Sequence, residues 1–327
     1  MKKLNYILSM AIAMGIFSCS NDAEIINGLE NVEGVSMDAK FLNLGSSVHK
    51  LNVSNAIIKS RKNIPENLLV AIYSAEYITT GENGKIGNTV YFNNRGNKQL
   101  IEDFVPGLAL DGTNDISYYV DNQRASSNLD VSLSNTAIDR AMNTWDNITC
   151  SNLGIFEIPF NEEASAGFVA KIISDDTGFD FGGSFDYFAD VVHAGWVSGD
   201  FFDYLVEDGS DFILGVTISI LFTDEEGNFI DLDNNGKLDI AFREIYYNDE
   251  FEWNDGKTFD VETVALHETG HGLSQAHFGK AFRNNSNGKL HFAPRAVMNA
   301  AYSGVQTEIN QSDEAGHCSN WAAWSKN

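Results

Sequence analysis

Basic residues, prolines and cysteines are all scarce in this 327-residue chain. Only 21 lysines and arginines stand against 46 aspartates and glutamates, which gives a formal net charge of −25. Nucleic-acid binding is therefore disfavoured, because phosphate contacts need clustered basic side chains. The large negative net charge favours a soluble protein. Four prolines and 28 glycines, spread along the chain, argue against a long disordered or collagen-like region.

The apolar run at the N-terminus is too short to span a bilayer. It extends from Leu4 to Phe17 behind Met1-Lys-Lys3, and this charge and length predict a signal peptide over residues 1–18. The run ends in Ile16-Phe17-Ser18-Cys19, which resembles the lipobox of bacterial lipoproteins. Cleavage before Cys19 would leave a lipidated cysteine. We therefore expect an exported protein, anchored by lipid alone to the outer membrane or cell surface of a Gram-negative bacterium.

Histidines are also few, yet three of the seven lie within eleven residues. His267 and His271 are four residues apart, so on a helix they share one face and can bind one metal ion together. Glu268 would then lie beside the metal without ligating it, and His277 follows six residues after His271. Three protein ligands and one open position are typical of a catalytic zinc, at which water becomes a nucleophile. The segment predicts a zinc peptidase.

The residues around this segment suit a helix that ends before the third histidine. Residues 261–266 are apolar where a core-packed helix should be, and Asp260 is placed as its N-cap. Gly272 and Ser274 are small, as a helix end and a returning chain require. A carboxylate is the alternative to His277 as third ligand, because it can replace an imidazole on zinc. The candidates are Glu308, Asp313 and Glu314.

These residues resemble the metzincin signature HExxHxxGxxH, with Ser274 in place of its glycine. That glycine turns the chain in a left-handed conformation, which costs another residue about 1–2 kcal/mol. Downstream, Ala296-Val-Met298-Asn-Ala-Ala-Tyr302 resembles the Met-turn, with the matrixin spacing of methionine and tyrosine and Ala300 in place of proline. The resemblance implies that Met298 forms a hydrophobic floor under the metal and that Tyr302 shapes the substrate pocket.

The matrixin resemblance also implies how a substrate would bind. Extended peptide would lie antiparallel along a sheet edge. The resemblance assigns that edge to residues 189–196, similar to the matrixin Leu-Ala-His-Ala strand, with His193 structural or lining the substrate. The acidic run from Arg243 to Trp253 resembles a matrixin calcium segment, but Phe251 replaces its glutamate.

A stronger calcium candidate precedes that run. Residues 231–239 place oxygens at alternate positions around a glycine, as in the first half of an EF-hand loop. Position twelve is Phe242 rather than glutamate, and the flanking residues 218–222 and 240–242 indicate strands. A plain hairpin on Asn-Gly is therefore the alternative to a Ca²⁺ site. The candidate ligands are Asp231, Asp233, Asn235, Lys237 and Asp239.

The chain divides into three parts by pattern. A signal peptide (1–18) precedes a tether and β-rich N-terminal region of unknown role (19–111), in which residues 68–73 indicate a strand. Residues 112–327 show a strand (116–120), an amphipathic helix (135–145), short strands (154–159 and 169–173) and the histidine helix. This order resembles a metzincin catalytic domain. We therefore expect an α/β (α+β) fold with a mixed twisted sheet, a long helix and an active-site helix.

Cys150 and Cys318 form an even pair in an oxidising compartment. Cys150 closes the long helix, and Cys318 lies in a C-terminal helix. If these two helices pack together, the cysteines can form a disulfide. The alternative is that both remain free thiols.

Two functions follow from these observations. The first is a monomeric zinc endopeptidase that cuts extracellular protein. The second is an inactive surface adhesion or binding protein on a metzincin scaffold. The presence of Glu268 favours the enzyme, because a purely structural metal site gains nothing from an unliganded carboxylate.

Overall fold

The computed structural model describes residues 29–31, 47–53, 68–82, 98–104, 110–284 and 289–324. The predicted signal peptide and Cys19 lie outside these residues. Within them, no helix has the length and apolar character needed to cross a membrane.

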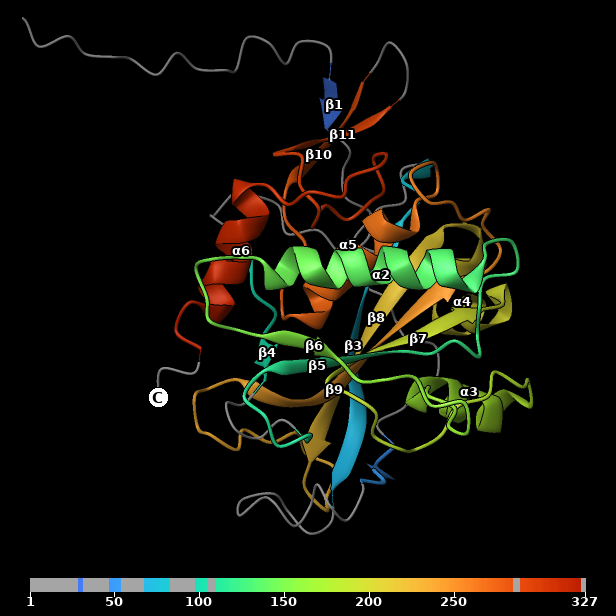
Figure 1. Ribbon diagram of the computed structural model, residues 1–327, viewed down its shortest axis with the longest axis vertical. Helices are drawn as coiled ribbons and strands as arrows, with labels where there is room; N and C mark the ends of the chain where they lie inside the picture. The colour runs from blue at the N-terminus through green and yellow to red at the C-terminus, as the bar shows by residue number, and fades with distance from the viewer. Residues whose placement is uncertain are drawn as a thin grey trace, which may run out of the picture.

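A mixed sheet of eight strands forms the centre of the molecule (Figure 1). Seven strands follow one another in space as β2 (His49–Lys50), β3 (Leu69–Thr79), β8 (Ile213–Thr223), β9 (Leu238–Asn248), β7 (Val191–Val197), β5 (Ile116–Val120) and β6 (Ile155–Glu157), and β4 (Glu102–Asp103) pairs with β9. The strands from β9 to β6 run parallel, whereas β8 and β3 are antiparallel to their neighbours. The prediction of a mixed α/β fold is confirmed.

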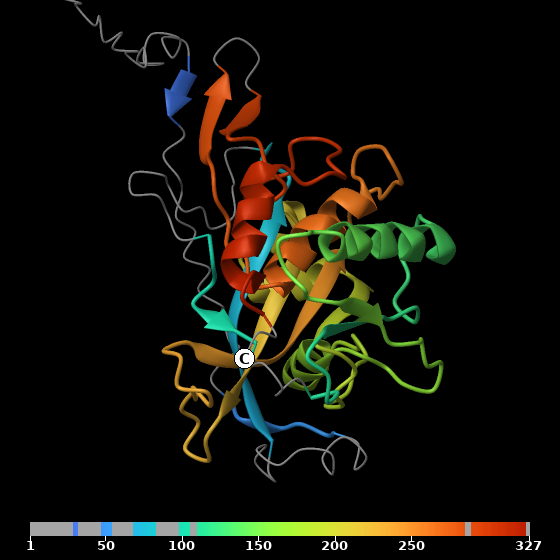
Figure 2. The same ribbon diagram turned by 60° about the vertical axis from the view of Figure 1, so that its left-hand side comes forward.

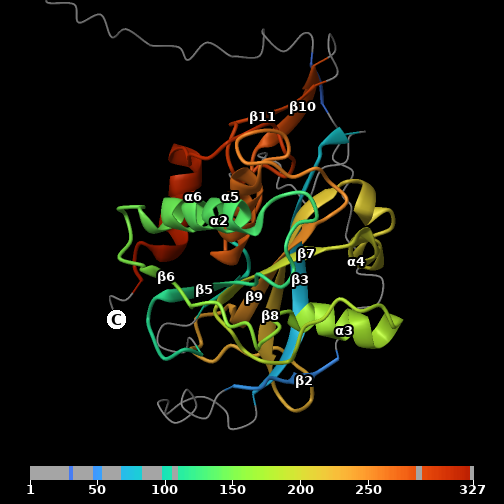
Figure 3. The ribbon, with the colours of Figure 1, turned by 45° about the vertical axis from the view of Figure 1, so that its right-hand side comes forward.

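Helices cover both faces of this sheet (Figures 1 and 3). They are α2 (Val131–Asp146), α3 (Phe168–Thr177), α4 (Gly199–Leu205), the short η3 (Gly209–Asp211), α5 (Val261–Gly272) and α6 (Gln311–Trp321). Side chains alternate between two cores along each strand. On β9, Ile245 and Tyr247 pack with α2 and α5, whereas Tyr246 between them packs with α3 and α4. The result is a three-layer arrangement with α5 on one face.

A smaller sheet lies apart from the main one, at the top of Figure 1. Its strands are β1 (Leu29–Asn31), β10 (Lys280–Asn284) and β11 (Leu290–Ala293), all paired antiparallel. The N-terminal region therefore contributes strands to both sheets.

One predicted strand is wrong. Residues 169–173 belong to helix α3, whose first amides Phe168 N and Val169 N donate to the buried carboxylate of Glu244 at 2.6 and 3.0 Å. A carboxylate stabilises a helix N-terminus, because the first amides there have no partner within the helix. A five-residue apolar run is too short to distinguish strand from helix by periodicity alone.

The predicted substrate edge is also wrong. Residues 189–196 contain most of β7, which pairs with β5 on one side and with β9 on the other. A strand with two partners has no free backbone groups along it for an added peptide. His193 is fully buried, and its Nδ1 lies 2.8 Å from the Tyr247 hydroxyl, so its role is structural.

Candidate metal centre

Helix α5 holds the first two histidines. Asp260 caps it, accepting a hydrogen bond from Thr263 N at 2.8 Å. Every residue of the helix is buried, because α2 covers one side and the sheet the other. Burial lowers the pKa of His267 to about 4 and that of His271 well below its ordinary value. Both imidazoles are therefore neutral at pH 7, as metal ligation requires.

The chain turns sharply after α5 and brings in the third histidine. Ser274 has a φ of +65°, the left-handed conformation that glycine adopts in the resembled signature. Its hydroxyl accepts a hydrogen bond from Arg243 Nη1 at 2.8 Å, and the same nitrogen donates to Gly272 O at 3.1 Å. Arg243 thereby fixes the turn that returns His277 to the helix.

The three Nε2 atoms converge on one point. They are separated by 2.9 Å (His267–His277), 3.1 Å (His267–His271) and 3.0 Å (His271–His277). Ligands on a tetrahedral zinc with bonds of about 2.0–2.1 Å lie about 3.3 Å apart. The three side chains therefore form a group that could bind a metal ion.

The outer nitrogens fix the tautomer of the first two histidines. Nδ1 of His267 lies 2.6 Å from Val297 O, and Nδ1 of His271 lies 2.7 Å from Gln275 O. A carbonyl only accepts, so each Nδ1 carries the proton and each Nε2 presents a lone pair. These two lone pairs lie 3.1 Å apart and point to the same place, as two ligands of one metal ion would. Nδ1 of His277 faces the Glu76 carboxylate at 3.6 Å.

Glu268 projects from α5 toward the antiparallel part of the sheet. Its Oε1 accepts a hydrogen bond from Ile78 N at 3.1 Å, and its Oε2 accepts one from Thr217 Oγ1 at 2.6 Å. Burial, with a further contribution from Glu76, raises the pKa of this carboxyl to about 8. The two neighbours come from β3 and β8, which the motif alone could not indicate.

The predicted Met-turn residues lie against the same helix. Met298 is fully buried, and a Cβ added to Gly270 would lie only 2.2 Å from its Sδ. Glycine at 270 thus lets the methionine pack directly on α5. The Tyr302 hydroxyl accepts a hydrogen bond from Asp260 N at 3.3 Å, next to the start of the helix.

The alternative carboxylate ligands do not join this group. Asp313 accepts hydrogen bonds from Val297 N at 3.0 Å and from Met298 N at 3.2 Å. Its two oxygens therefore hold the turn beneath the histidines rather than a metal. Within the described residues, the groups with metal-binding spacing contain neither Glu308 nor Glu314.

The candidate calcium loop connects β8 to β9. Asp231, Asp233 and Asp239 each bring a carboxylate oxygen within 4.8 Å of the others. Asn235 lies against these carboxylates, since its backbone N–H donates to Asp231 and to Asp233 at 3.1 and 3.0 Å. The ammonium of Lys237 instead pairs with Asp103 on β4 at 3.2 Å.

Asp239, at the start of β9, is the unusual member of this group. It is 0% exposed, its Oδ2 accepts a hydrogen bond from Leu232 N, and its Oδ1 has no hydrogen-bond partner among the described residues. Burial, together with the charges of Asp233, Asp231 and Asp103, raises its pKa to about 7. A buried carboxylate oxygen among other carboxylates fits a site for a hard cation.

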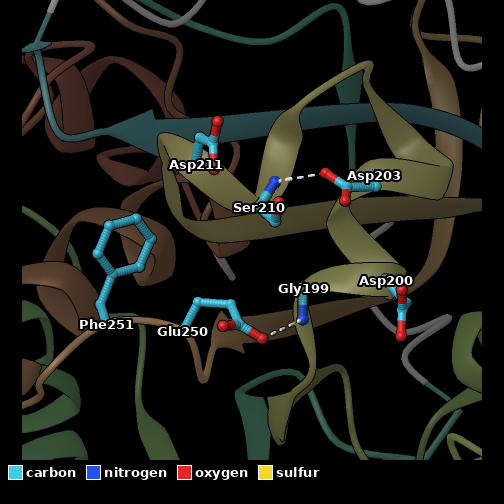
Figure 4. Close-up of a pocket in the computed structure, with 7 residues that line it drawn as sticks. All are labelled: Gly199, Asp200, Asp203, Ser210, Asp211, Glu250 and Phe251. Carbon is cyan, nitrogen blue, oxygen red and sulfur yellow. Dashed lines mark hydrogen bonds between the residues drawn. The ribbon is translucent and has the colours of Figure 1, made fainter.

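The acidic run at the end of β9 is different. Glu250 lines a pocket with Asp200, Asp203 and Asp211 (Figure 4). Glu250 accepts a hydrogen bond from Gly199 N at 3.2 Å, and Asp203 accepts one from Ser210 N at 2.8 Å. Among the described residues, this run contributes to no group with metal-binding spacing.

No family model matches this chain, and the curated proteins contain no significant match to it.

Proposed function

We propose that this protein is a zinc-dependent endopeptidase of the metzincin type that hydrolyses extracellular protein. The observation that carries the proposal is the convergence of three imidazole Nε2 atoms, two of them from α5, beside the carboxyl group of Glu268 on the same helix. The left-handed Ser274 and the packing of Met298 on α5 support it.

The mechanism assigns a separate task to each side chain. His267, His271 and His277 would hold zinc, which when bound polarises the scissile carbonyl and lowers the pKa of water. In its ionised form, Glu268 accepts the proton of the attacking water and returns it to the leaving amine. The carbonyls of Val297 and Gln275 keep the first two imidazoles in the ligating tautomer.

Metal retention tests the ligand set on the full chain. We expect one zinc per chain in the wild type and in Glu268→Gln, and a loss of at least about tenfold in affinity for His277→Ala. His291 is exposed on strand β11, so His291→Ala is the matched control and should keep the metal. Unchanged zinc in His277→Ala after dialysis would exclude that histidine as a ligand.

Peptide cleavage tests the general base. Glu268→Gln keeps the size of the side chain but cannot accept the proton, so we expect turnover of a casein or peptide-library substrate to fall by about 10³ or more. Equal turnover by wild type and variant, both loaded with zinc, would refute the mechanism.

A binding protein with a structural metal is the second candidate. It is favoured by the burial of the centre, because His267, His271 and Glu268 are 0% exposed and both Glu268 oxygens are already hydrogen-bonded. This candidate predicts stoichiometric zinc and no cleavage in any form of the protein.

We propose in addition that the loop after β8 binds Ca²⁺. Asp239 would supply the unpartnered oxygen, with Asp231 and Asp233 beside it. A ligand at 100 times its Kd stabilises by about 2.7 kcal/mol, so millimolar Ca²⁺ should raise the Tm by several degrees. Asp239→Asn should abolish this increase, whereas Glu225→Gln, an exposed change of charge in the same loop, should retain it. An equal increase in both variants would exclude the site.

We also propose that the protein is attached to a membrane surface. Cys19 would carry a lipid that attaches a monomeric protein to the membrane surface, and Cys19→Ser should leave it in the soluble fraction. Membrane association of that variant would contradict a lipid anchor.

A further inference from the structure

Strand β3 occupies the outer edge of β8 along its whole length (Figure 2). The pairing is antiparallel and runs from Leu69 opposite Thr223 to Thr79 opposite Ile213. On its other side, the end of β3 contacts the segment after the Met-turn, since Tyr302 N donates to Thr79 O at 2.7 Å and Thr79 forms a parallel bridge with Ala301. The last residues of β3 therefore lie between β8 and residues 300–302.

The same end of β3 reaches the metal centre. Ile78 N donates to Glu268 Oε1 at 3.1 Å, and Glu76 Oε2 lies 3.6 Å from Nδ1 of His277. Ile78 is itself buried, within the core that contains Met298 and Tyr302. With β3 in place, the side chains of the centre are at most 1% exposed. No substrate could reach them in this form.

An edge such as that of β8 is a binding surface for extended polypeptide. Its backbone N–H and C=O groups can pair with any extended chain, so they select conformation rather than sequence. Its end at Gly215 adjoins Glu268, since a Cβ added to Gly215 would lie 3.2 Å from Glu268 Cγ. A peptide on this edge would therefore pass directly beside the general base.

We infer that the channel between β8 and residues 300–302 is the peptide-binding groove, and that β3 occupies it as an internal, substrate-like strand. The inference rests on the proposed function. Substrate binds only when β3 has left, so the described form is latent. Release of β3 frees the edge of β8 and one oxygen of Glu268 together, because Ile78 N is withdrawn with the strand.

Displacement of β3 from the intact chain tests this inference. A protease recognition sequence is inserted between residues 83 and 97, which follow β3, and the chain is cut after folding and loading with zinc. The probe is a fluorescent peptide hydroxamate, which binds an accessible zinc without being cleaved. We expect at least about tenfold tighter probe binding after the N-terminal fragment has dissociated, with a matching gain in casein cleavage.

Two variants make the result decisive. Val70 is 0% exposed and pairs with Phe222, far along the strand from Ile78. Val70→Asp weakens the docking of β3 by burying a charge and leaves the residues that face the centre unchanged. If the native N-terminal fragment stays bound after the cut, the fragment that carries Val70→Asp should still dissociate. The matched control has its cut between residues 285 and 288, which leaves β3 in place and should not change probe binding.

The outcomes separate this inference from the proposed function. Zinc that stays bound while probe binding does not rise after the fragment has left would overturn the inference. Equal probe binding by the uncut wild type would overturn it as well. A chain that retains no zinc in any form would instead refute the proposed function. Excess N-terminal fragment, added back to the cut protein, should again block probe binding and casein cleavage. This result would support the inference further.

Discussion

Ser274 illustrates how much one residue contributes to this centre. Its left-handed backbone places His277, and its hydroxyl accepts a hydrogen bond from the fully buried Arg243. Glycine would avoid the conformational cost but could not accept that hydrogen bond. The serine thus combines a small backbone penalty with a charge-assisted hydrogen bond, which contributes about 1.5–3 kcal/mol.

A pair of substitutions separates the two effects. Ser274→Ala and Ser274→Gly both lose the hydroxyl, but only alanine keeps the left-handed penalty of about 1–2 kcal/mol. We expect both variants to be less stable than the wild type, and alanine to be about 1 kcal/mol less stable than glycine. Urea unfolding with the disulfide intact measures the difference. Equal stability of the two variants would mean that residue 274 stores no strain.

At the scale of elements, the Met-turn and helix α6 support each other. Asp313 is in the first turn of α6, and its carboxylate accepts hydrogen bonds from Val297 N, Met298 N and Asn310 N. The carbonyl of Val297 in turn faces Nδ1 of His267. The helix therefore positions a metal ligand through the turn, a chain of contacts that no local motif contains.

Asp313→Asn should weaken this connection. The amide cannot accept from all three donors, so we expect a loss of about 2–3 kcal/mol in unfolding free energy and weaker zinc retention. Glu314→Gln is the matched control, since it removes the same charge from the same turn of α6 and should cost no more than about 0.5 kcal/mol. Similar losses in both variants would assign the effect to the helix dipole.

At the scale of the whole molecule, a disulfide joins helix α6 to the segment that follows α2. Cys150, after α2, is bonded to Cys318 on α6 across 168 residues. The bridge encloses α5, the Met-turn and the main-sheet strands β6, β7, β8 and β9 in one loop. Its closure restricts the unfolded chain far more than the folded one.

Removal of the bridge should be costly for this reason. For a loop of this length we expect Cys150→Ala with Cys318→Ala to lower the unfolding free energy by about 3–5 kcal/mol. Either single variant should lose nearly as much, because each already breaks the bond. Additive losses in the double variant would show that the effect comes from side-chain packing.

The sequence alone predicted the parts of the centre that follow from local spacing. His267 and His271 share a face because their helix has a period near 3.6, and Asp260 caps that helix because its side chain reaches the third amide. The small residues Gly272 and Ser274 predicted the turn after the helix, and the resemblance to the metzincin signature predicted its left-handed conformation at Ser274. Each of these features depends on fewer than a dozen neighbouring residues.

Tertiary structure decided which strands form the edges of the sheet and what covers them. Residues 189–196 looked like an edge, but their pairing with both β5 and β9 depends on segments far away in the chain. The contact of Ile78 with Glu268 spans 190 residues. Strand pairing is made by backbone groups that every residue carries, so the sequence of one strand does not specify its partner.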